Sequence, residues 1–132
     1  MGDSIVYLDR SAIRSDDIDG LRSAVQGLVD FVRQHEPQLA YYGFEIDEAN
    51  RAMSLVAVHP DSASLELHLS IGGPEFRKVG AFIELRSIDL YGQPSEAALD
   101  QVREKGRLLG RDVIPVVHPL ASSFSRLSPS KG

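Results

Sequence analysis

One segment, residues 15–36, constrains the fold of this chain most, because its apolar side chains recur at helical spacing. They fall three, four and one residues apart and form a single stripe: Ile18, Leu21, Val25, Leu28, Val29 and Val32. Ser15 or Asp16 is expected to cap the start of the helix, and Pro37 to end it after His35 and Glu36. The sequence thus predicts an amphipathic helix that must pack on another layer.

Runs of β-branched and aromatic residues predict that this other layer is a sheet. Residues 4–10 are expected to form the first strand, and residues 39–46 and 51–59 two more. The polar residues 47–50 lie between the last two runs, as in a hairpin, so those strands should be antiparallel neighbours.

Side-chain alternation in this hairpin indicates which residues face the helices. If Ile46 lies opposite Arg51, one face carries the more apolar set: Tyr42, Phe44, Met53 and Leu55. We expect this set to line any pocket between the sheet and its helices.

The rest of the chain predicts further helices and strands. They are a short helix from Asp61 to Gly72, an irregular or helical piece over residues 75–80, a strand over residues 81–90, a helix over residues 96–109 and a last strand over residues 113–117. Pro115 lacks the N–H that a central strand needs, so the last strand is expected at a sheet edge or exchanged between subunits.

The resulting order, β-α-β-β-α-β followed by α-β, predicts an α+β ferredoxin-like fold with an antiparallel sheet and its helices on one face. The strand runs are apolar at neighbouring positions, so the second sheet face also needs a cover. We therefore expect a homodimer packed sheet to sheet. Residues 1–120 form a single domain in this interpretation, and residues 121–132 a flexible or partner-contacting tail.

Composition excludes several functions. The chain has 132 residues, no cysteine and a net charge of −5, with lysines and arginines scattered singly, so we expect neither thiolate chemistry nor nucleic acid as a partner. It has no apolar run approaching the ~20 residues of a membrane helix. Its start does not resemble a secretory signal, so a cytoplasmic location and no membrane association are expected. Motifs of hydrolases, P-loop proteins and nicotinamide enzymes are missing from the sequence.

Three segments together resemble a known family: Tyr41-Tyr42-Gly43-Phe44-Glu45-Ile46-Asp47, Val58-His59-Pro60-Asp61-Ser62-Ala63 and Leu67-His68-Leu69. Their order is similar to the dimeric α/β-barrel superfamily, in its antibiotic-biosynthesis-monooxygenase-like group, which includes small quinol monooxygenases. The resemblance covers residues 41–90 best. It implies a homodimeric α/β barrel that oxidises a small aromatic or quinol molecule with dioxygen, without a metal or other cofactor. Other members degrade haem or have no known reaction. Some members place a tryptophan near the substrate, which this chain lacks, and the Gly72-Gly73-Pro74 turn is unusual.

The resemblance makes His68 the candidate catalytic base, because a neutral imidazole can accept a proton from a quinol hydroxyl near neutral pH. The alternative is a half-buried structural histidine with a hydrogen-bond partner. Candidate substrate-binding residues are Tyr42, Phe44, Met53 and Arg86, although packing also explains the first three and an ion pair with Glu84 explains Arg86.

His59 is interpreted as a solvated or turn-bonding residue, and His118 as a contact with the partner subunit that is not catalytic. The histidine spacing does not favour a metal site. Two functions stay open at this point. One is a cofactor-independent monooxygenase, and the other is a non-catalytic module that binds a small ligand or supports assembly on the same barrel.

Overall fold

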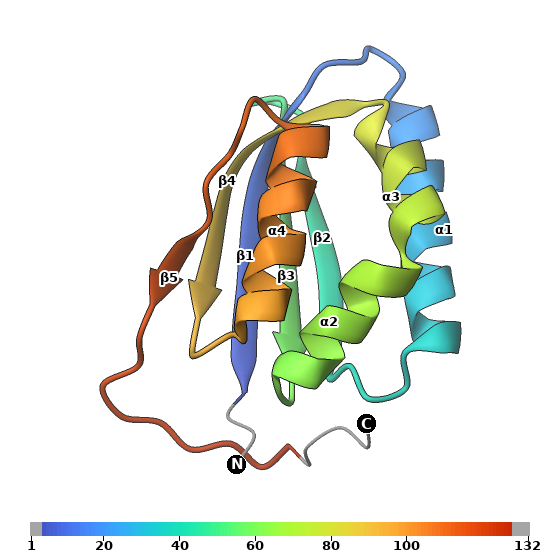
Figure 1. Cartoon of the computed structure of the whole chain (residues 1–132). Coiled ribbons are helices and arrows are strands. Elements are labelled where there is room, and N and C mark those ends of the chain that lie inside the picture. Colours follow the sequence, from blue (N-terminus) through green and yellow to red (C-terminus); the bar gives the residue numbers. More distant parts are fainter. Residues whose placement is uncertain (1–3, 128–132) are drawn as a thin grey trace.

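The chain folds into a sheet with helices packed over one face (Figure 1). The computed structural model describes residues 4–127. Its elements in chain order are β1 (Ile5–Ile13), α1 (Ile18–His35), β2 (Tyr41–Asp47), β3 (Ala52–His59), α2 (Ser62–Ile71), α3 (Gly73–Gly80), β4 (Ile83–Tyr91), α4 (Glu96–Leu109) and β5 (Val116–His118). This order confirms the α+β ferredoxin-like prediction.

The strand order is β2-β3-β1-β4-β5. β1 lies at the centre and pairs antiparallel with β3 and β4, while β5 pairs parallel with β4. The sheet is therefore mixed, which corrects the expectation of a purely antiparallel sheet. β5 lies at the edge of the sheet, as predicted, but it begins at Val116, after Pro115, and not at residue 113. The sheet does not close on itself within one chain.

α1 forms where the apolar stripe predicted it. Its N-cap is Asp17, whose carboxylate accepts a hydrogen bond of 2.8 Å from the backbone N–H of Gly20. The predicted caps were wrong, since the Ser15 hydroxyl instead accepts from the Asp17 N–H. The helix ends at His35, and its buried face packs on the sheet, so the stripe fixes where the chain turns back toward β2.

The β2–β3 hairpin has a different register from the predicted one. Ile46 pairs with Met53 rather than with Arg51, because Arg51 belongs to the turn, with a φ of 51°. A slip of two residues keeps every side chain on its predicted face. Tyr42 and Phe44 therefore pack with the helix-facing core, as expected.

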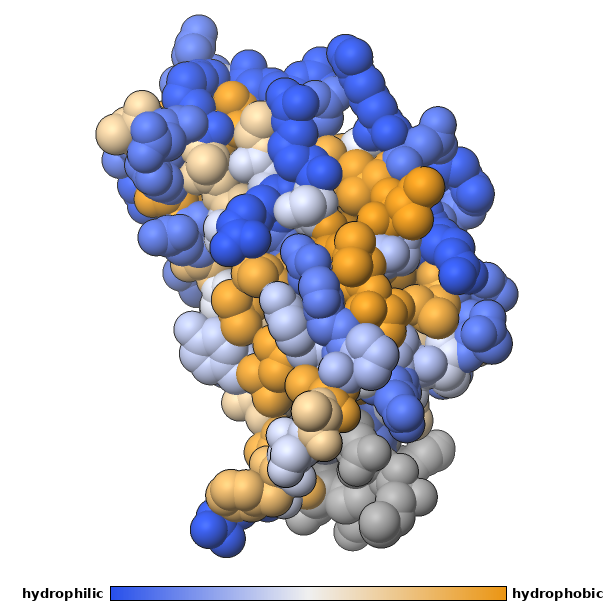
Figure 2. Space-filling model, turned by 90° about the vertical axis from the view of Figure 1, so that its left-hand side faces the viewer, coloured by the Kyte–Doolittle hydropathy of each residue, from blue (hydrophilic) through white to orange (hydrophobic). Residues whose placement is uncertain are grey.

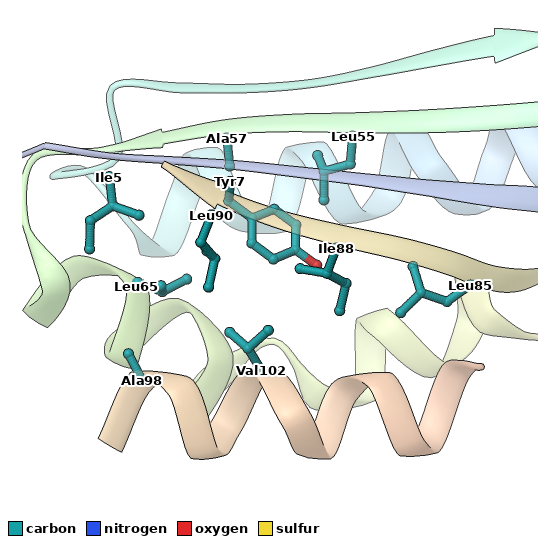
Figure 3. Packing of buried hydrophobic residues seen from close by; sticks show 10 residues of the cluster. All are labelled: Ile5, Tyr7, Leu55, Ala57, Leu65, Leu85, Ile88, Leu90, Ala98 and Val102. Atoms are coloured by element: carbon teal, nitrogen blue, oxygen red, sulfur yellow. The ribbon is translucent and has the colours of Figure 1, made fainter. Parts of the chain in front are cut away.

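A buried core joins the sheet to α2 and α4. Figure 3 shows side chains of β1, β3 and β4 that point toward Leu65 of α2 and toward Ala98 and Val102 of α4. These three helix residues are fully buried. Because they come from both helices, α2 and α4 pack against the same apolar part of the sheet face.

Residues 75–80, which the sequence left open between a turn and a helix, belong to α3. The Phe76 ring of this helix lies directly over Gly72. A Cβ atom at position 72 would lie 2.5 Å from a ring carbon, so only glycine lets the ring reach this place. Gly72, between α2 and α3, thus lets Phe76 take its position, while Gly73 and Pro74 begin α3.

The C-terminal segment from residue 121 to residue 127 forms no helix or strand and leaves Phe124 79% exposed. Its Ser125 hydroxyl accepts a hydrogen bond of 2.7 Å from the Ser4 hydroxyl. Residues 1–3, and residues 128–132 of the predicted tail, lie outside the described residues. Among the helices of residues 4–127, none has the length and apolarity to cross a membrane.

Leu65→Ala should lower the free energy of unfolding by about 2–5 kcal/mol, because it leaves a cavity where α2 meets the sheet. Urea unfolding measures this change. Leu67→Ala on the same helix is the control, since Leu67 is 42% exposed and should cost under about 0.5 kcal/mol. Equal losses for the two variants would contradict the assigned core.

Candidate functional site

A buried pair of titratable side chains, Glu36 and His68, lies between α1 and α2. His68 projects from α2, and Glu36 is the C-cap residue directly after the end of α1. The Nδ1 atom of His68 lies 2.8 and 2.9 Å from the two carboxylate oxygens of Glu36. The side chain of His68 is 4% exposed and that of Glu36 is 0% exposed, so the pair is withdrawn from water.

Burial shifts the pKa of each member in the direction that favours its neutral form. It raises the pKa of Glu36 from 4.5 to about 7. It lowers the pKa of His68 from 6.5 to about 3, helped by the positive charge of Lys105. The imidazole of His68 is therefore neutral at pH 7, and the proton that titrates near neutrality belongs to Glu36.

The two protonation states of Glu36 give His68 different chemistry. When Glu36 is ionised, Nδ1–H of His68 donates to the carboxylate, and the lone pair on Nε2 is left to act as a base. When Glu36 is protonated, it donates to Nδ1, and Nε2 carries the hydrogen. No hydrogen bond within residues 4–127 engages this Nε2 atom. The pair can thus accept or deliver a proton at one ring nitrogen.

Three other rings surround the His68 imidazole. Those of Tyr42 and Phe76 each have their centroids 5.1 Å from it, and that of His59 lies 5.5 Å away. The Tyr42 hydroxyl and His59 Nε2 are buried without a hydrogen-bond partner. Burial raises the pKa of Tyr42 well above 10, so its phenol remains a donor. Unpartnered buried polar atoms are costly, and they mark places where a ligand oxygen could be bound.

His59 is fully buried, so the expectation that it is solvated was wrong, and its other ring nitrogen has a hydrogen-bond partner. Its Nδ1 lies 2.8 Å from the Ser64 hydroxyl oxygen, which also accepts from the Gln38 amide at 3.2 Å. Burial, with the neighbouring His68, lowers the pKa of His59 to about 3, so this ring is neutral as well. This network ties the end of β3 to the first turn of α2.

A buried ion pair forms a second polar cluster. The Lys105 ammonium of α4 lies 3.2 Å from Oδ2 of Asp9 on β1, and the Tyr7 hydroxyl donates to the same oxygen at 2.6 Å. Burial, followed by the Asp9 charge, raises the pKa of Tyr7 well above 10. The ammonium also lies over the rings of Tyr7 and Phe76, at 4.6 and 5.2 Å from their centroids.

A small cavity of about 30 Å³ lies between these clusters. Its wall is largely apolar and includes Tyr42, Phe44 and Met53, together with Phe76 and the polar residues Asp9, Ser11 and Lys105. The imidazole of His68 is not part of the wall. Tyr42 and Phe76, whose rings contact His68, separate it from the cavity.

The structure thus brings together four of the five candidate residues from the sequence. Tyr42, Phe44 and Met53 line the cavity, and His68 lies directly behind its wall. Arg86 does not join them. Its side chain is 62% exposed and pairs with Glu84 at 3.2 Å. His118 also lies elsewhere, on β5, where it pairs with Asp89 at 2.8 Å.

Sequence reasoning missed Glu36, Asp9 and Lys105. Asp9 left a signal, because it follows Ile5 and Tyr7 at period-two spacing and so faces the core as a charged residue. Glu36 and Lys105 left none, since their partners lie 32 and 96 residues away in the chain. Within residues 4–127, no group of three or more His, Asp or Glu side chains is placed to hold a metal ion.

Solved structures with the same arrangement of helices and strands show which fold this is. The chain is similar to MupZ from Pseudomonas fluorescens, with a TM-score of 0.71 and 16% identity, over 94% of this chain and 95% of that one. It is similar to SnoaB from Streptomyces nogalater, described as a cofactor-independent oxygenase, with a TM-score of 0.59 and 14% identity, over 70% of this chain and 95% of that one.

A third structure, from Caulobacter crescentus, is described as a candidate antibiotic biosynthesis monooxygenase. It matches with a TM-score of 0.60 and 11% identity, over 67% of this chain and 88% of that one. The chain has the fold of antibiotic-biosynthesis-monooxygenase-like proteins. At these identities the likeness concerns the fold of the group and not its chemistry. No family model and no curated relative matches the sequence.

Glu36→Gln should remove a loss of stability that the wild type shows as pH rises toward 7. The pKa of Glu36 is about 7 in the folded chain and 4.5 as its ordinary value, so between these pH values the folded chain holds a proton that the unfolded chain has lost. The free energy of unfolding of the wild type should therefore fall relative to Glu36→Gln as pH rises through this window. The expected change is on the order of a few kcal/mol.

Urea unfolding of both proteins over this pH range measures the difference. The lowered pKa of His68 acts in the opposite sense, removing stability as pH falls below 6.5, but it is present in both proteins and largely cancels. Two stability curves that stay parallel from pH 4.5 to 7 would show that Glu36 titrates as an ordinary carboxyl.

Proposed function

We propose that this protein is a cofactor-independent oxygenase that acts on a small aromatic molecule of the quinol type, with His68 as the catalytic base. The observation that carries the proposal is the Glu36 carboxylate bound to Nδ1 of His68, beside two rings that line an apolar cavity. The likeness in fold to SnoaB, described as a cofactor-independent oxygenase, adds support.

In this proposal, Glu36 orients the imidazole and His68 takes the proton. Ionised Glu36 holds the Nδ1–H tautomer, as a carboxylate does in other carboxylate–histidine pairs, so Nε2 can accept a proton from a substrate hydroxyl. Because the pKa of Glu36 is about 7, the base form of the pair becomes dominant as pH rises above neutrality. The buried environment keeps His68 neutral and therefore competent as a base.

The reaction needs no other reductant, because the substrate supplies all the electrons. Removal of the hydroxyl proton makes the ring electron-rich, and a ring carbon forms a bond to dioxygen. Return of the proton gives a hydroperoxide. Its O–O bond breaks while the same ring carbon loses its hydrogen as a proton, and this proton leaves with the outer oxygen as water. One oxygen atom stays on the ring as a carbonyl and the other becomes water. A hydroquinone thus loses four electrons to dioxygen and becomes a hydroxylated quinone.

Substrate binding requires a change at Phe76. A cavity of about 30 Å³ holds roughly a water molecule and not an aromatic ring. Phe76 lies between the cavity and His68. Its side chain packs over Gly72 and can rotate about its own single bonds. Rotation of this ring would open the space to His68, with Tyr42, Phe44 and Met53 as the apolar wall.

The wild type should consume oxygen with one or more members of a panel of hydroquinones. His68→Ala should lower the rate by about 10²-fold or more, because it removes the base. The rate of the wild type should rise with pH through about 7, as Glu36 loses its proton. An oxygen electrode measures the uptake.

His118→Ala is the matched control, since His118 is a histidine of β5 that pairs with Asp89 and stacks on Tyr91, away from the candidate site. It should keep the wild-type rate. Ligand-dependent thermal shifts without turnover of any hydroquinone would overturn the oxygenase. They would support the second function considered above, a non-catalytic ligand-binding module.

We also propose that the protein acts as a homodimer in which two sheets pack against each other. The sheet face opposite the helices carries half-buried Val6, Leu8, Val56 and Val58 side by side in the β1–β3 ladder. Figure 2 shows apolar surface on the side of the molecule where β4 and β5 lie in Figure 1. The exposed large apolar residues on and around β5 include Ile114, Val116 and Val117. Such a surface is larger than isolated apolar residues explain, and a second copy can cover it.

Val56→Glu should convert the dimer to a single chain, because it puts a charge in the centre of the packed sheets. Sedimentation velocity at micromolar concentration measures the assembly. Ser23→Glu, on the exposed side of α1, is the control and should leave the sedimentation coefficient unchanged. A wild type that sediments as a single chain would contradict the dimer.

A further inference from the structure

The Lys105 ammonium is buried with most of its hydrogen-bonding capacity unused. Its side chain is 9% exposed, and its hydrogen bond within the described residues goes to Oδ2 of Asp9. An ammonium has three N–H donors, so two remain for another acceptor. The groups with charge or a titratable proton around it lie on two sides. In the interior they are Asp9, Tyr7, Tyr42, His59 and His68, and on the surface side they are Arg77 and Glu104.

Lys105 lies where the interior cavity meets a surface groove. The groove has a volume of about 320 Å³ and runs between α3 and α4. It is lined by Leu69, Leu108 and the polar residues Gln101 and Glu104, among others. Lys105, Phe76 and Leu109 line both the groove and the cavity. The groove is within the usual size of small-molecule sites, about 300–1,000 Å³, so it can take what the cavity alone cannot.

The Phe76 ring is close to both polar clusters. Its centroid is 5.1 Å from that of the His68 ring and 5.2 Å from the Lys105 ammonium. An aromatic ring that takes the place of Phe76 would therefore lie close to both the imidazole and the ammonium. Polar substituents on such a ring could reach both.

The polar atoms of the cavity wall are mostly hydrogen-bond donors without partners. The hydroxyls of Ser11 and Tyr42 are buried and unpartnered, and Lys105 adds its spare N–H groups. Asp9 is the acceptor in this wall, and its Oδ2 already receives two hydrogen bonds. A wall of donors with one cation is complementary to an oxygen that carries negative charge.

We propose that the groove and cavity bind an aromatic molecule with an ionised ring hydroxyl, and that Lys105 binds this phenolate oxygen. Lys105 is then a specificity-determining residue that favours acidic phenols over neutral aromatic rings. This inference rests on the proposed function, because it names the ionisation state in which the quinol-type substrate is held. Binding does not require turnover, so the two can be tested apart.

The experiment uses 4-nitrophenol, whose ionised form is yellow and whose neutral form is not. Titration of the full chain with this probe under nitrogen should show that the bound phenol ionises at a pKa about one to three units below that of the free phenol. Lys105→Met should abolish this shift. Lys78→Met is the control, because Lys78 is an exposed lysine of α3 that pairs with Glu75 and lines neither the groove nor the cavity.

Lys105→Met leaves Asp9 buried without its cation and could fail to fold, so a second variant keeps the test decisive. Asp9→Asn retains the ammonium and removes the competing carboxylate, and it should lower the pKa of the bound phenol further than the wild type does. An unshifted probe in the wild type, or the same shift in Lys105→Met or no further shift in Asp9→Asn, would overturn the inference. A shift that depends on Lys105, without oxygen uptake from any hydroquinone, would uphold the binding site and reject the oxygenase alone.

Discussion

The arrangement of the candidate site depends on the hydrogen bonds between Glu36 and His68. Both side chains are withdrawn from water, so each must be satisfied by the other. This contact joins the end of α1 to α2, and the rings of Tyr42 and Phe76 pack against the imidazole that it holds. This one buried contact therefore supports the two rings, from β2 and α3, that form part of the cavity wall. A hydrophobic pair at the same positions could pack as well, but it would leave no group that titrates near neutrality.

The interior of this small domain holds more polar chemistry than its stability requires. Asp9 and Ser11 lie on the core face of β1, where the strand pattern favours apolar residues such as Ile5 and Ile13. The Ser11 and Tyr42 hydroxyls and one nitrogen of His59 are buried without partners. Such departures from a well-satisfied core destabilise the fold, and in proteins they concentrate where a ligand binds. Asp9, Ser11 and Tyr42 all line one cavity, and this is the reason to assign function here and not to the exposed Arg86 or His118.

The sequence predicted the fold well because the fold is encoded in local spacing. The stripe from Ile18 to Val32 gave the helix, and alternation put Tyr42 and Phe44 on the correct face even though the hairpin register was wrong by two residues. The parallel pairing of β5 was not predictable, because three residues beside Pro115 carry no signal of direction. The site was only partly predictable. His68 was found through a resemblance in a short motif, whereas its partner Glu36 and the Asp9–Lys105 pair depend on contacts between distant elements. No periodicity or short motif encodes those contacts.

The central claim is that burial and Glu36 hold His68 as a neutral imidazole with its hydrogen on Nδ1 and a free Nε2. The most direct test is the ¹⁵N NMR titration of the ring nitrogens of His68 in the wild-type protein. We predict two shifts typical of a neutral ring above pH 7, a change that follows the ionisation of Glu36 at about 7, and no imidazolium until pH falls toward 3. A ring that becomes an imidazolium near pH 6.5, the ordinary value for histidine, would contradict the account.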